Sequence, residues 1–258
     1  MRLRRLLRRL GALALLATVG LAPAAPAPEL QRLTVAGCSF PNHTLIEMLT
    51  RAHALGFSGV ELAVFADNEK SNAPDSAPWV VIDQLRADAR VQLKAAVANF
   101  RHVSVHLPYG KAMRPLSPDP AVRDAARSEL RRALDDGHFL GASVANVHVL
   151  TEPGLAFEPA LPELVALYRE LGDYAHHRGI RLAIETTRPY RADEFLTLIR
   201  AVGHPNVGAC IDTGHVHFFA ELAEARRKRQ APESVQAYND LLNELVAKLG
   251  PKLFHLHL

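Results

Sequence analysis

The sequence predicts an α/β protein, a (β/α)8 barrel of the TIM type that is truncated after its seventh strand. Short apolar runs alternate with longer segments of helical spacing from about residue 33 to the last residue. This alternation indicates parallel strands joined by right-handed helical crossovers. Polar residues follow the apolar runs at their C-terminal ends, which is where a barrel of this type carries its chemistry.

Seven apolar runs are expected to form strands. They cover residues 33–38, 59–65, 103–106, 143–149, 181–184, 207–211 and 253–258. The segments expected to be helical cover residues 45–55, 79–100, 121–140, 159–177, 192–202 and 234–249. The polar segment 66–78 is long enough to help cover a site. The basic run 226–229 is expected to be a solvated loop, with contact to a sugar phosphate as the alternative.

A closed barrel of this type needs eight strands, and the run 253–258 leaves no residues for an eighth. The first and last strands would then expose unpaired backbone, which favours association of chains, so a homo-oligomer is one expectation. The competing fold is a doubly wound open sheet. That fold needs a glycine-rich phosphate loop after an early strand, and the segment 36–41 (Ala-Gly-Cys-Ser-Phe-Pro) is a poor match.

The first 24 residues have the three parts of a secretory signal peptide: a basic start, an apolar stretch and small residues suited to cleavage. Residues 25–32 form a Pro/Ala spacer, and residues 33–258 form the barrel. Arg4-Arg5 before two leucines weakly resembles a twin-arginine export signal. We therefore expect an exported protein, periplasmic or secreted, with no membrane attachment after cleavage, and an uncleaved anchor is the alternative.

The basic character of the whole chain comes mostly from the signal peptide. The chain has 30 Lys+Arg against 27 Asp+Glu, and five of the arginines lie in residues 1–9. Removing those five arginines from the 30 leaves 25 basic against 27 acidic residues, a net charge of about −2. The mature chain therefore gives no indication of a nucleic-acid partner.

Side chains that can bind metal close five consecutive apolar runs at their C-terminal ends. These residues are His106, His148, Glu185, Asp212 and His257, and His215 follows Asp212 after a two-residue turn. Imidazole and carboxylate groups are competent ligands for divalent ions, and the C-terminal ends of barrel strands face one common rim. The pattern predicts a metal site built from nitrogen and oxygen ligands.

Each of these residues also has a structural interpretation. His106 and His148 could be satisfied histidines of the barrel interior, and Asp212 could cap the turn that follows it. Glu185 could be a buried acid paired with a cation, for which Arg188 is available. These alternatives stay open at this point.

Two further residues belong to the same group of strands. Glu61 either pairs within the barrel or contacts substrate. His255 shares its strand parity with His257, so both side chains should point the same way. His257 lies nearer the rim and is the expected ligand, whereas His255 is expected to support it or to lie in the core.

Six motifs together resemble a known family. They are Gly59-Val-Glu-Leu, Val105-His-Leu-Pro-Tyr, Asn146-Val-His, Ile184-Glu-Thr, Ile211-Asp-Thr-Gly-His and Phe254-His-Leu-His. Their order and spacing are similar to those of the xylose-isomerase-like TIM barrels, which include sugar isomerases, sugar and sugar-phosphate epimerases, and AP endonucleases of the endonuclease IV type.

The resemblance implies one divalent ion bound by Glu185, Asp212 and His257. Mn, Co and Zn suit these ligands, and the imidazole disfavours Mg. His215 would contact substrate, and His106 and His148 would line the pocket, with Glu61 a further candidate for substrate binding. The family's fourth ligand, a glutamate on the eighth strand, has no counterpart in this sequence.

The resemblance also implies a sugar or sugar phosphate as the small-molecule partner. The expected enzyme is an isomerase or epimerase that removes a proton next to a carbonyl through a metal-stabilised enediolate, with Glu185 as the base. Whether the 258-residue chain is active by itself stays open. The alternatives are a zinc-dependent phosphodiesterase resembling the AP endonucleases and a non-catalytic sugar-binding remnant.

Overall fold

One parallel sheet forms the centre of the protein, in a computed structural model that describes residues 33–40, 43–65, 79–228 and 231–258. The expected signal peptide, the spacer and the loop 66–78 lie outside these residues. The strands are β1 (Thr34–Ala36), β2 (Gly59–Ala63), β3 (His102–His106), β4 (Val144–His148), β5 (Arg181–Glu185), β6 (Val207–Asp212) and β7 (Leu253–His257).

The spatial order of these strands is their order in the sequence, and every neighbouring pair is parallel. Within the described residues β1 and β7 are not hydrogen-bonded to each other, so the curved sheet is open between them. The register places Ala63 beside His106, His148 beside Glu185 and Asp212 beside His257, which sets the strand ends along one edge. The predicted α/β barrel architecture is confirmed.

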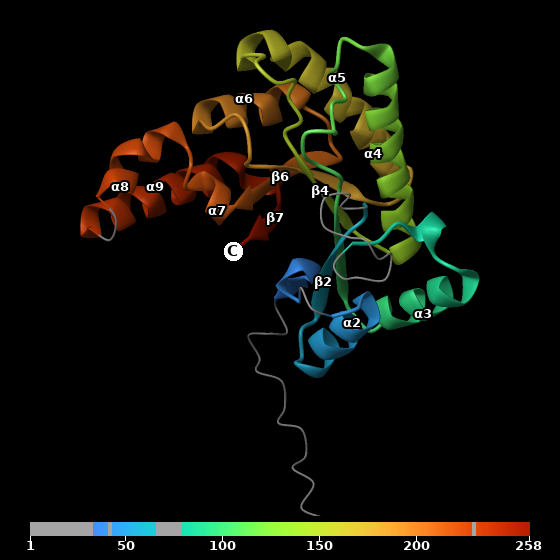
Figure 1. The fold of residues 1–258 in the computed structure, drawn as a ribbon. Helices are drawn as coiled ribbons and strands as arrows, with labels where there is room; N and C mark the ends of the chain where they lie inside the picture. Colours follow the sequence, from blue (N-terminus) through green and yellow to red (C-terminus); the bar gives the residue numbers. More distant parts are fainter. Residues whose placement is uncertain (1–32, 41–42, 66–78, 229–230) are drawn as a thin grey trace, which may run out of the picture.

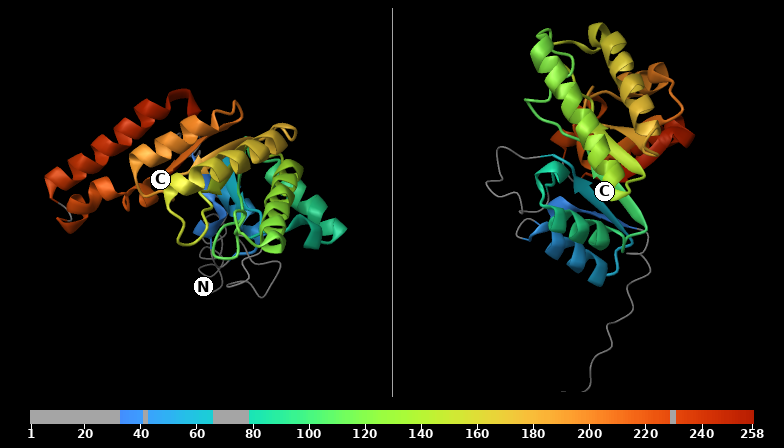
Figure 2. Two further views of the ribbon diagram at one scale, coloured as in Figure 1. Left: turned by 90° about the horizontal axis from the view of Figure 1, so that it is seen from above. Right: turned by 90° about the vertical axis from the view of Figure 1, so that its right-hand side faces the viewer.

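Helices cover the outer face of this sheet (Figure 1). They are α2 (Leu45–Ala54), α3 (Ala87–Val97), α4 (Pro120–Leu140), α5 (Phe157–His176), α6 (Ala192–Val202), α7 (Thr213–Val216), α8 (Ala223–Arg227) and α9 (Pro232–Leu249). The described chain also contains the 3-10 turns η2 (Gly37–Ser39), η3 (Ile82–Gln84), η4 (Ala220–Leu222) and η5 (Gly250–Lys252). Successive long helices lie side by side around the sheet, as α4 and α5 do in Figure 2.

Local sequence signals set the ends of several helices. Thr44 and Glu47 form a reciprocal capping box at the start of α2. Asp119 caps α4 by accepting a hydrogen bond from Ala121 N at 2.9 Å, and Pro120 occupies the first helical position, which needs no N–H partner. Gly141 ends α4 with φ of 77°, a left-handed conformation that glycine adopts without a steric cost.

Two sequence predictions are wrong in detail. The helix expected over 79–100 begins only at Ala87, because Val80 N bonds to Ala63 O at 2.9 Å and Ile82 N bonds to the Asp136 carboxylate at 3.2 Å. These contacts to β2 and α4 fix the backbone of residues 80–82, so the α-helix begins only after them. The basic run expected to be a loop lies partly in α8, and Arg226 is not merely solvated there, because it donates to two backbone carbonyls.

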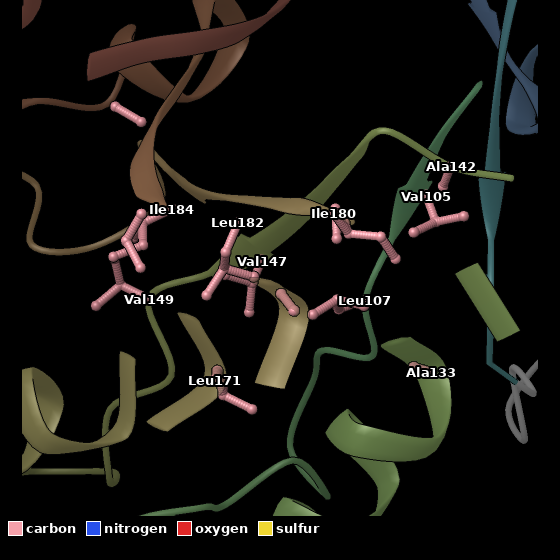
Figure 3. Close-up of a cluster of buried hydrophobic side chains, with 14 of the residues drawn as sticks. Val105, Leu107, Ala133, Ala142, Val147, Val149, Leu171, Ile180, Leu182 and Ile184 are labelled. Carbon is pink, nitrogen blue, oxygen red and sulfur yellow. The ribbon is translucent and has the colours of Figure 1, made fainter. Parts of the chain in front are cut away.

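The two faces of the sheet carry different side chains. On the outer face, large apolar residues of β3, β4 and β5 pack against Ala133 of α4 and Leu171 of α5 (Figure 3). The barrel interior holds a much smaller apolar cluster of Val144, Ala183 and Cys210, with Phe254 packed against it. Small interior residues leave room for the polar side chains of the rim.

Within the described residues, no helix has the length and apolarity needed to cross a membrane.

Tyr168 joins α5 to the end of β4, directly beside the predicted site. Its side chain is fully buried, its hydroxyl donates to His148 O at 2.8 Å, and it accepts from Leu150 N at 3.0 Å.

The Tyr168→Phe variant would remove the hydroxyl that both backbone groups contact. We expect it to lower the free energy of unfolding by about 1–3 kcal/mol, measured by urea denaturation. Tyr190→Phe, at a ring that is 45% exposed, is the control and should leave stability unchanged.

Candidate metal centre

Glu185 occupies the centre of the rim at the end of β5, and only 1% of its side chain is exposed. His215 Nδ1 lies 2.8 Å and His148 Nε2 3.6 Å from Glu185 Oε1. His106 Nε2 lies 3.1 Å and His257 Nδ1 3.6 Å from Glu185 Oε2. The structure therefore gathers four predicted histidines, from β3, β4, α7 and β7, around one predicted carboxylate.

Asp212 lies beside this group at the end of β6. Its Oδ1 accepts a hydrogen bond from His215 N at 2.8 Å, which caps the short helix α7. Its Oδ2 lies 3.5 Å from His257 Nδ1 and 3.7 Å from His215 Nδ1. The capping and ligand interpretations of Asp212 are thus compatible, because one oxygen serves each.

The site holds ionised groups at low exposure. Burial opposes the charge of Glu185, but close contacts with the rings of His106, His215 and His257 bring the pKa of this carboxyl far below its usual range. Burial likewise opposes charge on His257, but contacts with Asp212 and other neighbours raise its pKa. Contact with Glu185 raises the pKa of His215. Burial lowers the pKa of His148 to about 3, so that ring is neutral.

The donor set fits a divalent ion. Glu185, Asp212 and His215 each offer a ligand atom, and these atoms lie within 4.8 Å of one another. His215 Nδ1 is buried and makes no hydrogen bond, although Glu185 Oε1 is only 2.8 Å away. A cation held by both atoms would satisfy this nitrogen. Geometry thus adds His215, expected only to touch substrate, to the candidate ligands Glu185, Asp212 and His257.

Glu61 lies one step deeper in the barrel than these residues. The register pairs it with Ser104, two residues before His106, and its side chain is 8% exposed. Its carboxylate accepts hydrogen bonds from Ser104 Oγ at 2.8 Å and from Asn146 Nδ2. His257 Nε2 lies 3.1 Å from its Oε1, and His255 Nε2 lies 3.3 Å from its Oε2.

Several residues of the site were not singled out in the sequence. Ser104 and Asn146 each stand two positions before a rim histidine, so strand alternation could have placed them on the interior face. Tyr109 stacks on the ring of His148, with centroids 4.4 Å apart and an interplanar angle of 27°. Only its place in the motif Val105-His-Leu-Pro-Tyr could have indicated Tyr109 from the sequence. Within the described contacts, histidines and not Arg188 accompany the Glu185 carboxylate.

An open cavity of about 1170 Å³ extends along the barrel interior. Its walls include His106, His148 and Asp212 at the strand ends, and His102 and Arg181 at the strand starts. Glu61, Glu185, His215 and His257 also line it. All the predicted site residues therefore face one continuous space.

The parallel barrel strands and the rim of histidines and carboxylates define an α/β-barrel protein with a candidate metal centre. A family model described as xylose isomerase-like TIM barrel matches residues 49–258, and the chain belongs to this family. No curated protein matches the chain significantly.

Solved structures share the fold. A D-psicose 3-epimerase crystallised in the presence of D-fructose is 18% identical with a TM-score of 0.62, over 87% of this chain and 71% of that chain. A xylose isomerase-like TIM barrel protein from Mycobacterium smegmatis in complex with magnesium is 18% identical with a TM-score of 0.57, over 88% and 74%. A protein from Thermus thermophilus, soaked with ZnCl2, is 26% identical with a TM-score of 0.52, over 72% and 67%.

Metal binding at this site should release protons, since a protonated imidazole nitrogen has no lone pair for a metal. The pKa values of His215 and His257 are raised above that of an ordinary imidazole, so both rings hold their protons to a higher pH than usual. Lowering the pH should therefore weaken zinc binding. Calorimetry in two buffers of different ionisation enthalpy, at one pH, measures the protons released.

Equal zinc-binding heats in the two buffers would contradict this expectation. The control is His138→Ala, on the exposed side of α4 and hydrogen-bonded to Arg178 O, which should leave proton release unchanged.

Proposed function

We propose that the protein is a metal-dependent isomerase or epimerase of a sugar or sugar phosphate. The observation that carries the proposal is the Glu185 carboxylate, 1% exposed and surrounded by four histidines beside Asp212 at the rim of a barrel cavity. Membership of the xylose isomerase-like family supports it. The shared fold with an epimerase of a ketohexose supports it further.

We propose that Glu185, Asp212 and His257, with His215, hold one divalent ion. Mn, Co and Zn suit the mixture of imidazole and carboxylate, which favours Mg less. Once bound, the ion would neutralise the negative charge that develops on the substrate oxygens when a proton leaves the adjacent carbon. A magnesium complex of one similar protein and a structure of another after soaking with ZnCl2 support a divalent ion.

We propose a separate role in the reaction for each of the other side chains at the rim. Glu185 would take the proton next to the carbonyl, because its carboxylate lies at the centre of the rim, beside the proposed ion. The neutral ring of His148 and the partly exposed Tyr109 stacked on it would form a wall against the sugar. His106 would line the pocket, because both of its ring nitrogens have partners, Leu107 O at 2.9 Å and Glu185 Oε2 at 3.1 Å. His215 would contact a substrate oxygen through Nε2, since its Nδ1 faces Glu185.

The reaction type depends on where the proton returns. Glu185 alone can move a proton between adjacent carbons on one face of the sugar, which is isomerisation. Epimerisation needs a second acid on the other face. The other interior carboxylates of the described chain, Glu61 and Asp212, are engaged by His257 and by the start of α7.

A zinc-dependent phosphodiesterase is the second candidate. One observation favours it: His106, His148 and Glu185 form another group whose ligand atoms lie within 4.8 Å of one another. Additional zinc ions held there would suit phosphodiester hydrolysis. Two or three zinc ions per purified chain would favour this candidate over a single-ion isomerase.

We also propose that the protein is exported, with residues 1–24 removed and residues 33–258 forming the barrel. The basic and apolar start of the sequence supports export. Mass spectrometry of the protein recovered from the cell envelope and medium tests this. A mature N-terminus near residue 25 is expected, whereas an intact Met1 in the cytoplasm would contradict export.

Solvent-deuterium incorporation tests the enzyme proposal without knowledge of the natural substrate. Metal-loaded protein is incubated in D2O with ketohexoses and their phosphates, and proton NMR follows the carbon next to the carbonyl. We expect exchange, with a loss of at least about 100-fold in the Glu185→Gln variant because that variant lacks the base.

Glu194→Gln is the matched control, since Glu194 lies on α6 beside Arg191 and outside the rim. Its exchange rate should equal that of the unmodified chain. Exchange that persists in Glu185→Gln would refute the role of Glu185. Absence of exchange with every sugar tested, from a folded and metal-loaded sample, would favour the sugar-binding remnant.

A further inference from the structure

We propose that Glu61 is a positioning residue for the metal site, which holds the ring of His257 so that Nδ1 is presented to Glu185 and Asp212. The inference rests on the proposed metal-dependent function and adds a role for a residue expected to touch substrate. It assigns Glu61 to the support of a ligand and not to the substrate itself.

The ring of His257 lies between two carboxylate groups at different depths. Its Nε2 faces Glu61, at 3.1 Å from Oε1 and 3.3 Å from Oε2. Its Nδ1 faces the rim, at 3.5 Å from Asp212 Oδ2 and 3.6 Å from Glu185 Oε2. One nitrogen is thus available for a hydrogen bond and the other for a metal.

Glu61 can act only as an acceptor in this arrangement. Ser104 Oγ and Asn146 Nδ2 donate to its Oε2, and the ring nitrogens of His255 and His257 lie 3.3 Å and 3.1 Å from its oxygens. A carboxylate that accepts from these neighbours requires the hydrogen of His257 on Nε2. Nδ1 lies 3.5 Å from Asp212 and 3.6 Å from Glu185, too far for a good hydrogen bond, so Nδ1 is the nitrogen whose lone pair can bind the metal.

The remaining contacts of Glu61 hold it in place. Ser104 Oγ and Asn146 Nδ2 both donate to Oε2, and they come from β3 and β4. Asn146 Nδ2 also lies 3.4 Å from His257 Nε2, farther than Glu61 Oε1. The carboxylate is therefore fixed from two strands and is the nearer partner of the ring.

Glu61 could instead be a ligand, because Glu61, His255 and His257 also have ligand atoms within 4.8 Å of one another. The two donors from Ser104 and Asn146 argue against this, since they occupy lone pairs of Oε2 that a cation would need. A ligand role also competes for His257 Nε2. The two roles predict different numbers of bound ions, which makes them separable.

The first test uses the unmodified chain loaded with zinc and labelled with 15N-histidine. Long-range 15N–1H correlation NMR should show the His257 ring with its hydrogen on Nε2 and with Nδ1 bound to metal, the resonance being assigned with the His257→Asn variant. A hydrogen on Nδ1 and zinc on Nε2 would overturn the proposal. This measurement does not depend on whether a variant at Glu61 folds.

The second test compares zinc affinity and stoichiometry in Glu61→Gln with those of the unmodified chain, by competition with a chelator. We expect the affinity to fall by about 10–100-fold at unchanged stoichiometry, the usual effect of losing a carboxylate that supports a metal-bound histidine. Glu170→Gln, which removes a carboxylate paired with Arg127 and Arg131 on the helices, is the control and should bind zinc normally.

Unchanged affinity in Glu61→Gln would overturn the proposal, and so would the loss of one of two zinc ions, because Glu61 would then be a ligand. The readouts separate this inference from the proposed function. A chain that binds zinc through Nδ1 but exchanges no sugar proton supports the positioning role and refutes the enzyme proposal. Sugar proton exchange by the unmodified chain, together with unchanged zinc affinity in Glu61→Gln, would support the enzyme proposal and refute the positioning role.

Discussion

Burial of the Glu185 carboxylate in the barrel interior constrains everything around it. An ionised group removed from water is costly unless opposite charges or hydrogen-bond donors surround it. In this structure the compensation comes from imidazole rings on four separate elements, which converge because parallel strands end at one edge. Without a metal those rings must supply protons, and Nδ1 of His215 still makes no hydrogen bond. The proposed divalent ion would bind this nitrogen and the carboxylate together.

Depth in the barrel separates two groups of polar residues, for which we propose different roles. The rim group faces the cavity mouth, and a second group centred on Glu61 lies two residues lower on the strands. The ring of His257 connects them, with one nitrogen in each group. The small interior residues of β4, β5 and β6 make room for both. The outer face needs no such room, and its large apolar residues fix the strands that carry the site.

Much of this arrangement could be predicted from the sequence, because it follows from strand periodicity. The β/α alternation and the C-terminal ends of the strands placed His106, His148, Glu185, Asp212 and His257 on one rim without any knowledge of their contacts. Parity likewise paired His255 with His257, and both face Glu61 in the structure.

The contacts between side chains of different strands could not be predicted from the sequence. Which nitrogen of His257 faces which carboxylate depends on the stagger of β7, whose register shifts near Ala209 and Cys210. That shift leaves no mark in the pattern of apolar residues. Residues 79–86 were wrongly predicted to be helical for a similar reason. Their helical spacing is overridden by hydrogen bonds to Ala63 and Asp136, which are distant in sequence.

The measurement that tests the metal centre most directly is anomalous X-ray diffraction from crystals of the metal-loaded protein, recorded above and below the metal edge. One anomalous peak within bonding distance of Glu185, Asp212 and His257 is predicted, whereas an ion located elsewhere, or none in a folded and metal-saturated crystal, would contradict the account.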